Sequence, residues 1–278
     1  MGGKIVFYIF YGLISGLAEF LPVSQAAQGY LLSELTALDT RHPLMLLLIH
    51  LSCLAVLLIQ YRYRIAHMRR ELHLYSQPSG RRKRDPDTQT VLDGSVALNA
   101  MIPIVVLLAF SDFAYRRLTN PLFLSISLIV YGVLLYVPQF QPGANRDSRH
   151  LNRLEVLGMG VCAGLSVIPG VSRMGAFVSV GALRGCDRRY MLDIAFLVSI
   201  PALAMMIVLD AISLIALGFG AITGGMVLCS FLAAAAAFCG AWLAMAVMRF
   251  LCAGPNYGGF AYYSWALGVF SFILYLMV

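Results

Sequence analysis

The feature that most constrains this chain is a series of apolar runs, several of which reach the roughly 20 residues that a helix needs to cross a bilayer. Apolar residues make up 60% of the 278 residues and charged residues only 12%, with a mean hydropathy of +0.81. A soluble domain of this length would need far more polar surface. Because lipid offers no partner to backbone polar groups and the runs are too long for barrel strands, the sequence predicts an all-α polytopic membrane protein. Residues 1–278 are expected to form a single membrane domain with about six transmembrane helices, at 42–62, 95–112, 120–138, 190–208, 222–247 and 260–277.

The net charge of +7 is concentrated, since eight of the twenty lysine and arginine residues lie between Arg62 and Arg84. Under the positive-inside rule this pattern predicts a basic cytoplasmic loop at about 62–90 and does not favour a nucleic-acid partner. Contact of this loop with anionic lipid headgroups is compatible with the pattern. Alternation of the spans then places the other basic segments on the same side: the loop 139–154, the segment 184–189 and Arg249.

Two apolar stretches, at about 5–36 and 155–185, do not fit as simple spans, because Pro22 interrupts the first and Pro169 the second. Proline removes a helix hydrogen bond and clashes with the preceding turn, so each stretch should break into two short helices. Basic residues flank the second stretch at both ends, which predicts that it returns to the side it left as a re-entrant hairpin. Such backbone is tolerated at membrane depth where protein or a wet cavity surrounds it.

The two interrupted stretches also share a pattern, since Gly-Leu and Pro-(Gly)-Val-Ser recur about 148 residues apart. Each copy is followed by three spans, an odd number, so the second copy must insert upside down relative to the first. This arrangement predicts an inverted-topology repeat, about 1–138 and about 155–278, with a binding site where the interrupted segments meet. Coincidence between two apolar runs rich in glycine and proline is the alternative.

Glu19 in the first stretch and Arg173 in the second are the ionisable residues most expected to act together. Placing such groups in apolar spans costs roughly 2.5–3.5 kcal/mol on insertion scales, so they are functional candidates by default. If the two hairpin tips meet near the midplane, each charge neutralises the other, and Ser24 and Ser172 add hydroxyl groups. A purely structural buried ion pair is the competing interpretation.

The second tip also has the sequence of an anion site. Pro169-Gly170 followed by Ser172-Arg173-Met174-Gly175 predicts a turn that opens a helix. The free N–H groups of that helix start and the arginine would suit phosphate or carboxylate. The predicted phosphate ligands are Gly170, Ser172, Arg173 and Gly175, with Ser24, Gln25 and Gln28 from the first tip.

Other polar residues of the spans give weaker signals. His50 is either a hydrogen-bonded core residue or a base or ligand. Asp193 is expected to be a helix-start charge balanced by Arg188 or Arg189, and Asp210 to mark the end of a span. The six cysteines show no CxxC spacing and are interpreted as small core residues, so no metal site is expected.

The residues of both tips resemble the signatures of a known family, the undecaprenyl-diphosphate phosphatase or bacitracin-resistance family. The likeness is strongest in Glu19–Ser24 and Pro169–Ala176, and the run from Asp193 to Pro201 is similar to the stretch that follows the second signature. The resemblance implies six spans and two re-entrant hairpins, in agreement with the hydrophobic pattern. It also implies a bacterial inner-membrane protein whose ligand is a polyprenyl (undecaprenyl) phosphate or diphosphate, with its headgroup on Arg173 and its tail between helices.

The first signature departs from the family at positions that hydrolysis uses. The family has two glutamates four apart, a second serine after Pro-Val-Ser as the usual nucleophile, and a histidine three residues later. Here these positions hold Ser15, Gln25 and Gln28, and the serine after the arginine of the second signature is Met174. Glutamine is neither a nucleophile nor a titrating group, so the anion-binding half survives and the hydrolytic half is largely gone.

Three functions follow from this pattern. The leading interpretation is a lipid-carrier recycling protein that moves undecaprenyl phosphate between leaflets, with Arg173 as phosphate clamp and Glu19 as a proton-coupled group. The alternative is an active phosphatase with Ser24 or Ser172 as nucleophile or Glu19 activating water, and His50 replacing the lost histidine. In that case Mg²⁺ or Ca²⁺ would assist, as the resemblance suggests; no other cofactor is expected. A small-anion transporter on the same repeat is the third, and a homodimer is left open.

Overall fold

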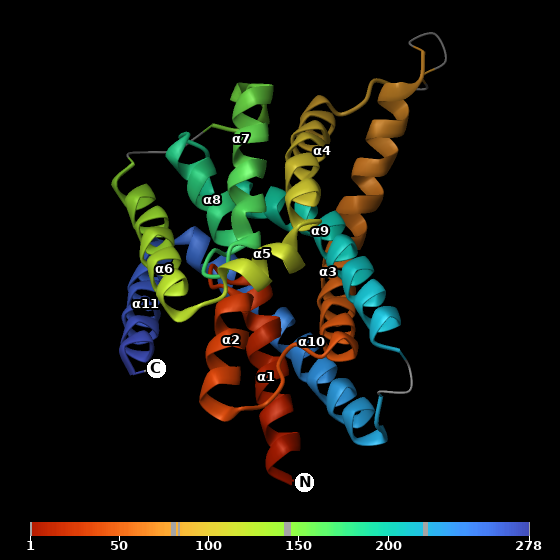
Figure 1. Cartoon of the computed structure of the whole chain (residues 1–278). Coiled ribbons are helices and arrows are strands. Elements are labelled where there is room, and N and C mark those ends of the chain that lie inside the picture. The colour runs from red at the N-terminus through yellow and green to blue at the C-terminus, as the bar shows by residue number, and fades with distance from the viewer. Residues whose placement is uncertain (1, 79–81, 83, 142–145, 219–221, 278) are drawn as a thin grey trace.

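The computed structural model describes residues 2–78, 82, 84–141, 146–218 and 222–277, and over these residues it contains helices and no strand (Figure 1). Within them, seven helices are long and apolar enough to cross a membrane, which confirms the prediction of an all-α polytopic membrane protein. Six correspond to the predicted spans, and the seventh is the first half of the stretch 5–36. They are α1 (Gly2–Phe20), α3 (Pro43–Ser76), α4 (Thr88–Leu108), α6 (Pro121–Tyr136), α9 (Arg188–Leu217), α10 (Gly224–Ala253) and α11 (Gly259–Met277).

Each proline-interrupted stretch folds into a hairpin of two helices, as predicted, although α1, with 19 residues, is longer than the short helix expected there. The first pairs α1 with α2 (Gln25–Thr36). The second pairs α7 (Arg153–Gly164) with α8 (Arg173–Leu183), after a 3₁₀ turn at Leu165–Val167. The two hairpins enter from opposite ends of the bundle and their tips lie together in its centre (Figure 1).

A serine caps each returning helix directly after the proline break. Ser24 accepts a hydrogen bond from the backbone N–H of Ala27 at 3.4 Å, and Ser172 accepts one from that of Gly175 at 3.5 Å. Each cap satisfies one of the N–H groups that a helix start leaves without a partner. In both hairpins the chain therefore leaves the helix before the proline and starts a new helix after the serine.

The helices of the two halves pack in reciprocal pairs. α1 packs against α10 as α7 packs against α4, and α3 packs against α10 as α9 packs against α4. α3 also packs against α9, and α6 against α11, which are counterparts in the two halves. A two-fold axis in the membrane plane would generate these pairs, as expected for an inverted-topology repeat.

The contact between α1 and α10 is close enough to require glycine. A Cβ on Gly12 would lie 2.1 Å from the carbonyl oxygen of Ala233, and one on Gly16 would lie 2.1 Å from that of Ala237. Small residues let helix backbones approach in a membrane, where association depends on van der Waals packing. This contact holds the first hairpin against the second half of the chain and so positions Glu19 near the end of α1.

The basic segment predicted as a loop at 62–90 is helical over its first half, because α3 continues through Ser76. Glu71 stabilises this extension, since its buried carboxylate accepts a hydrogen bond from Arg84 at 3.1 Å. The cytoplasmic location of the segment stays a prediction. Part of it lies outside the described residues, namely 79–81 and 83.

A short helix that the hydrophobic pattern did not predict, α5 (Ser111–Leu118), connects α4 to α6. It lies across the centre of the bundle and contacts the 3₁₀ turn at Leu165–Val167 (Figure 1). The predicted span 95–112 therefore ends earlier than expected, at Leu108, and the chain turns over the hairpin tips before it continues.

Candidate functional site

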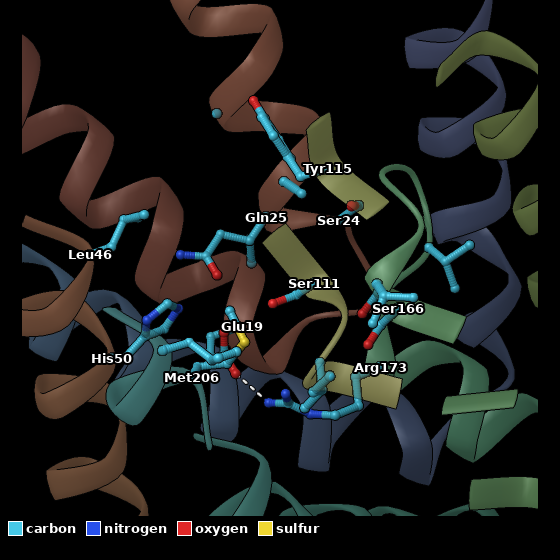
Figure 2. Close-up of a pocket in the computed structure, with 18 of the residues that line it drawn as sticks. Glu19, Ser24, Gln25, Leu46, His50, Ser111, Tyr115, Ser166, Arg173 and Met206 are labelled. Atoms are coloured by element: carbon cyan, nitrogen blue, oxygen red, sulfur yellow. Dashed lines mark hydrogen bonds and ion pairs between the residues drawn. The ribbon is translucent and has the colours of Figure 1, made fainter. Parts of the chain in front are cut away.

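A cavity of about 130 Å³, referred to as the tip cavity, lies between the two hairpin tips (Figure 2). Seven helices border it, namely α1, α2, α3, α4, α5, α8 and α9, together with the 3₁₀ turn at Leu165–Val167. Its volume is that of roughly four waters, which suits a phosphate-sized group and excludes a long lipid tail. Its polar lining residues are Tyr11, Glu19, Ser24, Gln25, Arg41, His50, Ser111, Asp112, Tyr115, Ser166, Ser172, Arg173 and Asp210.

Arg41, Asp112 and Tyr115 line the tip cavity, and because the side chains of Arg41 and Asp112 are 38% and 48% exposed, we refer to these three residues as its mouth. Arg41 forms an ion pair with Asp112 at 3.2 Å, and its guanidinium lies 3.6 Å above the ring centroid of Tyr115. Arg41 precedes α3 directly, whereas the basic segment follows it, and a 34-residue helix spans about 51 Å. If the basic segment is cytoplasmic, as predicted, the cavity faces the opposite side of the membrane.

Glu19 and Arg173 form an ion pair in the tip cavity, as predicted from their positions in the two stretches. Arg173 donates from Nη2 to Oε1 of Glu19 (Figure 2). Their side chains are 8% and 11% exposed, so both charges lie in the interior. Two charges out of water are stable only as a pair, which explains why the tips bring them together.

Two hydrogen bonds also join the tips, each between a serine hydroxyl of one tip and a backbone group of the other. The N–H of Gly170 donates to Oγ of Ser24 at 3.0 Å, and Oγ of Ser172 donates to the carbonyl oxygen of Leu21 at 3.1 Å. Within the described residues, neither serine hydroxyl makes a hydrogen bond to a histidine or a carboxylate. The two candidate nucleophiles therefore act as structural links in this conformation.

At the N-terminus of α8, two of the backbone N–H groups that the sequence predicted as anion ligands already have partners. The N–H of Gly170 is bound to Ser24 and that of Gly175 to Ser172, so neither is free for an anion. Neither glycine lines the tip cavity, and Gln28 does not line it either. The cap and the bond between the tips therefore use the N–H groups of the two glycines that were predicted to bind phosphate, whereas the predicted ligands Ser172 and Arg173 do line the cavity.

Two other donors at the cavity lack partners. Nε of Arg173 and Nε2 of Gln25 are buried and make no hydrogen bond within the described residues. Buried polar groups are nearly always satisfied, so such donors point to a ligand or water that completes them. Gln25 occupies the position where the resembling family has its nucleophile, and here it supplies a donor instead.

His50 and Asp210 form a second buried pair in the same cavity. Nδ1 of His50 lies 2.6 Å from Oδ2 of Asp210, and the two side chains are 4% and 10% exposed. The prediction that Asp210 marks the end of a span is wrong, because α9 continues through Leu217. The pairing follows from the packing of α3 against α9, which no local sequence pattern reveals.

Asp193 was expected to balance its basic neighbours at the start of a helix, but Asp187 is the residue that caps α9. Asp193 instead accepts hydrogen bonds from Tyr61 at 2.7 Å and from Arg64 at 3.3 Å. Arg64 also pairs with Asp93 at 3.5 Å. We refer to Tyr61, Arg64, Asp93 and Asp193 as the inner cluster. It joins α3, α4 and α9 at a point about 21 Å along α3 from His50.

The donor set of the tip cavity does not fit a resident metal. Within the described residues, no group of three or more histidine, cysteine, aspartate or glutamate side chains comes together. Glu19 is paired with Arg173, and Asp210 with His50. Assistance by Mg²⁺ or Ca²⁺ carried by a phosphate substrate stays a prediction.

Comparison with known proteins finds one matching family and relatives that share one name. A sequence model of the family described as "Bacitracin resistance protein BacA" matches residues 8–270. An undecaprenyl-diphosphatase of Carboxydothermus hydrogenoformans is 29% identical over 264 residues, which cover 95% of this chain and 94% of the relative. One of Thioalkalivibrio sulfidiphilus is 30% identical over 193 residues, covering 69% and 71% of the two chains. One of Neisseria meningitidis is 28% identical over 270 residues, covering 95% and 93%.

Proposed function

This chain belongs to the bacitracin resistance protein BacA family, and we propose that it binds the headgroup of a polyprenyl diphosphate in the tip cavity and hydrolyses the terminal phosphate. Its relatives are named undecaprenyl-diphosphatases, which supports both the lipid class and the reaction. The role would be recycling of the lipid carrier for peptidoglycan. The chain is a multi-pass membrane protein, and the proposed location is the bacterial inner membrane.

The observation that most supports headgroup binding is the pair of unused donors beside buried charge. Nε of Arg173 and Nε2 of Gln25 are both buried at the cavity and have no partner in the part of the chain that the structure describes. A diphosphate offers several acceptor oxygens, and arginine binds phosphate through two parallel hydrogen bonds. Arg41, which also lines the cavity, adds a second guanidinium for the diphosphate.

A headgroup in the tip cavity leaves the lipid tail outside it. The cavity of about 130 Å³ holds a few water-sized groups and no long isoprenoid chain. The tail would then lie along the apolar helix surfaces in the bilayer, so it would stay in apolar surroundings when the headgroup binds. Recognition of the ligand would therefore depend on the phosphate groups.

Hydrolysis has more support than the translocation that the sequence analysis favoured, because the relatives named as diphosphatases match almost the whole chain. Gln25 and Gln28 still remove the serine and histidine of the family pattern. Charge stabilisation by Arg173 survives their loss, and preorganised charge is usually the largest single contribution to such catalysis.

Translocation of the lipid phosphate is a second candidate, supported by the inner cluster. Arg64 bridges Asp93 and Asp193 and ties α3 and α4 to α9, while the tip cavity lies toward the other end of α3. A carrier that alternates between two faces needs one side closed while the other is accessible, and inverted repeats are the usual architecture for it.

Two measurements on the purified protein test these proposals together. Phosphate release from a polyprenyl diphosphate is expected above that of empty membranes, and Arg173→Ala is expected to abolish both release and polyprenyl-phosphate binding. Arg149→Ala, which changes an exposed arginine away from the cavity, is the matched control.

The outcomes separate the candidates. Binding without any phosphate release would exclude the phosphatase and favour translocation, which a liposome assay of lipid-phosphate movement then checks. Binding that Arg173→Ala leaves unchanged would exclude the tip cavity as the headgroup site.

A further inference from the structure

The pair formed by His50 and Asp210 joins two long helices that do not belong to the hairpin tips. His50 comes from the first half of α3 and Asp210 from the second half of α9, which are counterparts in the two repeats. The atoms Nδ1 and Oδ2 lie 2.6 Å apart, and both residues line the tip cavity. Titratable groups inside apolar helices are expensive, which makes them functional candidates.

The hydrogen bond to Asp210 orients the imidazole. A carboxylate that accepts from Nδ1–H leaves Nε2 as the basic nitrogen, which is the arrangement of a general base held by an acid. Nε2 of His50 makes no hydrogen bond within the described part of the chain. The ring lies near Glu19 of the Glu19–Arg173 ion pair, and all three residues line the cavity (Figure 2).

The other side chains of the cavity are less suited to proton transfer near neutral pH. Gln25 does not titrate, and the hydroxyls of Ser24 and Ser172 hold the tips together. The carboxylate of Glu19 is occupied by Arg173. A histidine titrates in the range that general acid–base catalysis needs.

We infer that His50, held by Asp210, is the general base of the proposed hydrolysis and replaces the tip histidine of the family, whose position is Gln28. This inference rests on the proposed function. Asp210 is a positioning residue, since it acts through His50. The relocation moves the base from a hairpin tip to the helix that faces it.

The reaction that this geometry supports is direct attack by water. Nε2 of His50 takes a proton from the water, and the water oxygen forms a bond to the terminal phosphorus. The bond between that phosphorus and the bridging oxygen breaks, and its electron pair stays on the bridging oxygen. The products are polyprenyl phosphate and inorganic phosphate, and His50 returns its proton to solvent. Arg173 stabilises the charge on the phosphoryl oxygens.

The charged groups that line the same cavity bear on the pH dependence. Around His50 these are Glu19 from α1, Arg173 from α8 and Asp210 from α9, with Arg41 and Asp112 at the mouth. Tyr11 and Tyr115 also line it. Loss of Asp210 should therefore move the acidic limb of the pH–rate profile, whereas loss of His50 should remove it.

The experiment compares wild type, His50→Gln and Asp210→Asn as purified full-length proteins with a polyprenyl diphosphate. We expect His50→Gln to lower kcat by about 10²–10⁴-fold with little change in KM, and to remove the acidic limb of the profile. Asp210→Asn should lower kcat less and shift that limb. His73→Gln is the control, because it makes the same change at an exposed site on the same helix.

The readouts keep the inference separate from the proposed function. A His50→Gln protein with wild-type kcat and pH profile would overturn the role of His50 and leave the phosphatase intact. A wild-type protein that binds polyprenyl phosphate and releases no phosphate would overturn the hydrolysis and the role of His50 with it. Polyprenyl-phosphate binding by His50→Gln verifies that this variant is folded.

Discussion

Oγ of Ser24 accepts a hydrogen bond from the N–H of Gly170 at 3.0 Å, which joins two hairpins that are 146 residues apart in the chain. In the other direction, Ser172 donates to the carbonyl oxygen of Leu21 at 3.1 Å. Both serines also cap the helices that follow them. The geometry therefore supports a structural role for these hydroxyls and leaves the attack on phosphorus to water.

Ser24→Ala should destabilise the fold. It leaves the buried N–H of Gly170 without a partner, which costs about 1–3 kcal/mol, and removes the cap of α2, which costs about 1 kcal/mol. Thermal unfolding of the purified protein measures the loss, with the exposed Ser95→Ala as control. A Ser24→Ala protein that melts like the control and yet releases no phosphate would show that Ser24 is a nucleophile after all.

The tips illustrate what the sequence could predict. Proline alone is not a sufficient signal, because Pro103 and Pro201 lie inside α4 and α9. Pro22 and Pro169 differ in that a capping serine follows two or three residues later, which favours a new helix. The interruption of each apolar run by proline predicted both hairpins, and the charged residue near each break predicted the meeting of Glu19 with Arg173.

What the sequence could not predict depends on packing between helices. His50 and Asp210 are 160 residues apart, and only the crossing of α3 with α9 brings them together. The N–H group of Gly170 looked free for phosphate because its partner, Ser24, belongs to the other hairpin. The basic segment was predicted to be a loop because its charges mark where the chain leaves the membrane. Charge does not end a helix, however, and α3 continues through Ser76.

Gly16→Ala should weaken the contact between α1 and α10. The added Cβ would lie 2.1 Å from the carbonyl oxygen of Ala237, and backbone cannot shift as cheaply as a side chain. Overpacking of this kind costs typically about 1–3 kcal/mol. Gly158→Ala is the matched control, since its Cβ would meet nothing within 4 Å. In that exposed helical position alanine should be neutral or stabilising. Equal melting temperatures for the two variants would contradict the close packing.

Glu155 should make the stability of the protein depend on pH. The backbone N–H of Asn152 and, after it, the guanidinium of Arg146 lower the pKa of this carboxyl group. Because the pKa is lower in the folded than in the unfolded protein, the stabilisation is present above the unfolded pKa and is lost as the pH falls through the folded pKa.

The check is the difference in melting temperature between wild type and Glu155→Gln as a function of pH. It should be constant near neutral pH and shrink below about pH 4.3, the ordinary value for glutamate. Glu34→Gln, at an exposed position of α2, should show no such trend. A difference that grows on acidification would mean that the carboxylate does not stabilise the start of α7.

The Glu19–Arg173 pair should behave as two buried charges that need each other. Arg173→Met leaves an unpaired carboxylate and Glu19→Gln an unpaired guanidinium, and removal of one partner of a buried pair costs about 3–5 kcal/mol. The double variant contains neither charge, so its loss of stability should be smaller than the sum of the losses in the two single variants. Thermal unfolding of the wild type, the two single variants and the double variant gives this double-mutant cycle.

The same variants decide whether this pair only stabilises the tips or also binds the ligand. A ligand that binds the folded protein raises its melting temperature by mass action, so polyprenyl phosphate should stabilise the wild type and not the double variant. Glu19 competes with the ligand for the guanidinium of Arg173. Glu19→Gln should therefore bind polyprenyl phosphate at least as tightly as the wild type, although its unliganded form is less stable. If polyprenyl phosphate stabilised the double variant as much as the wild type, the pair would be structural and the headgroup would bind elsewhere.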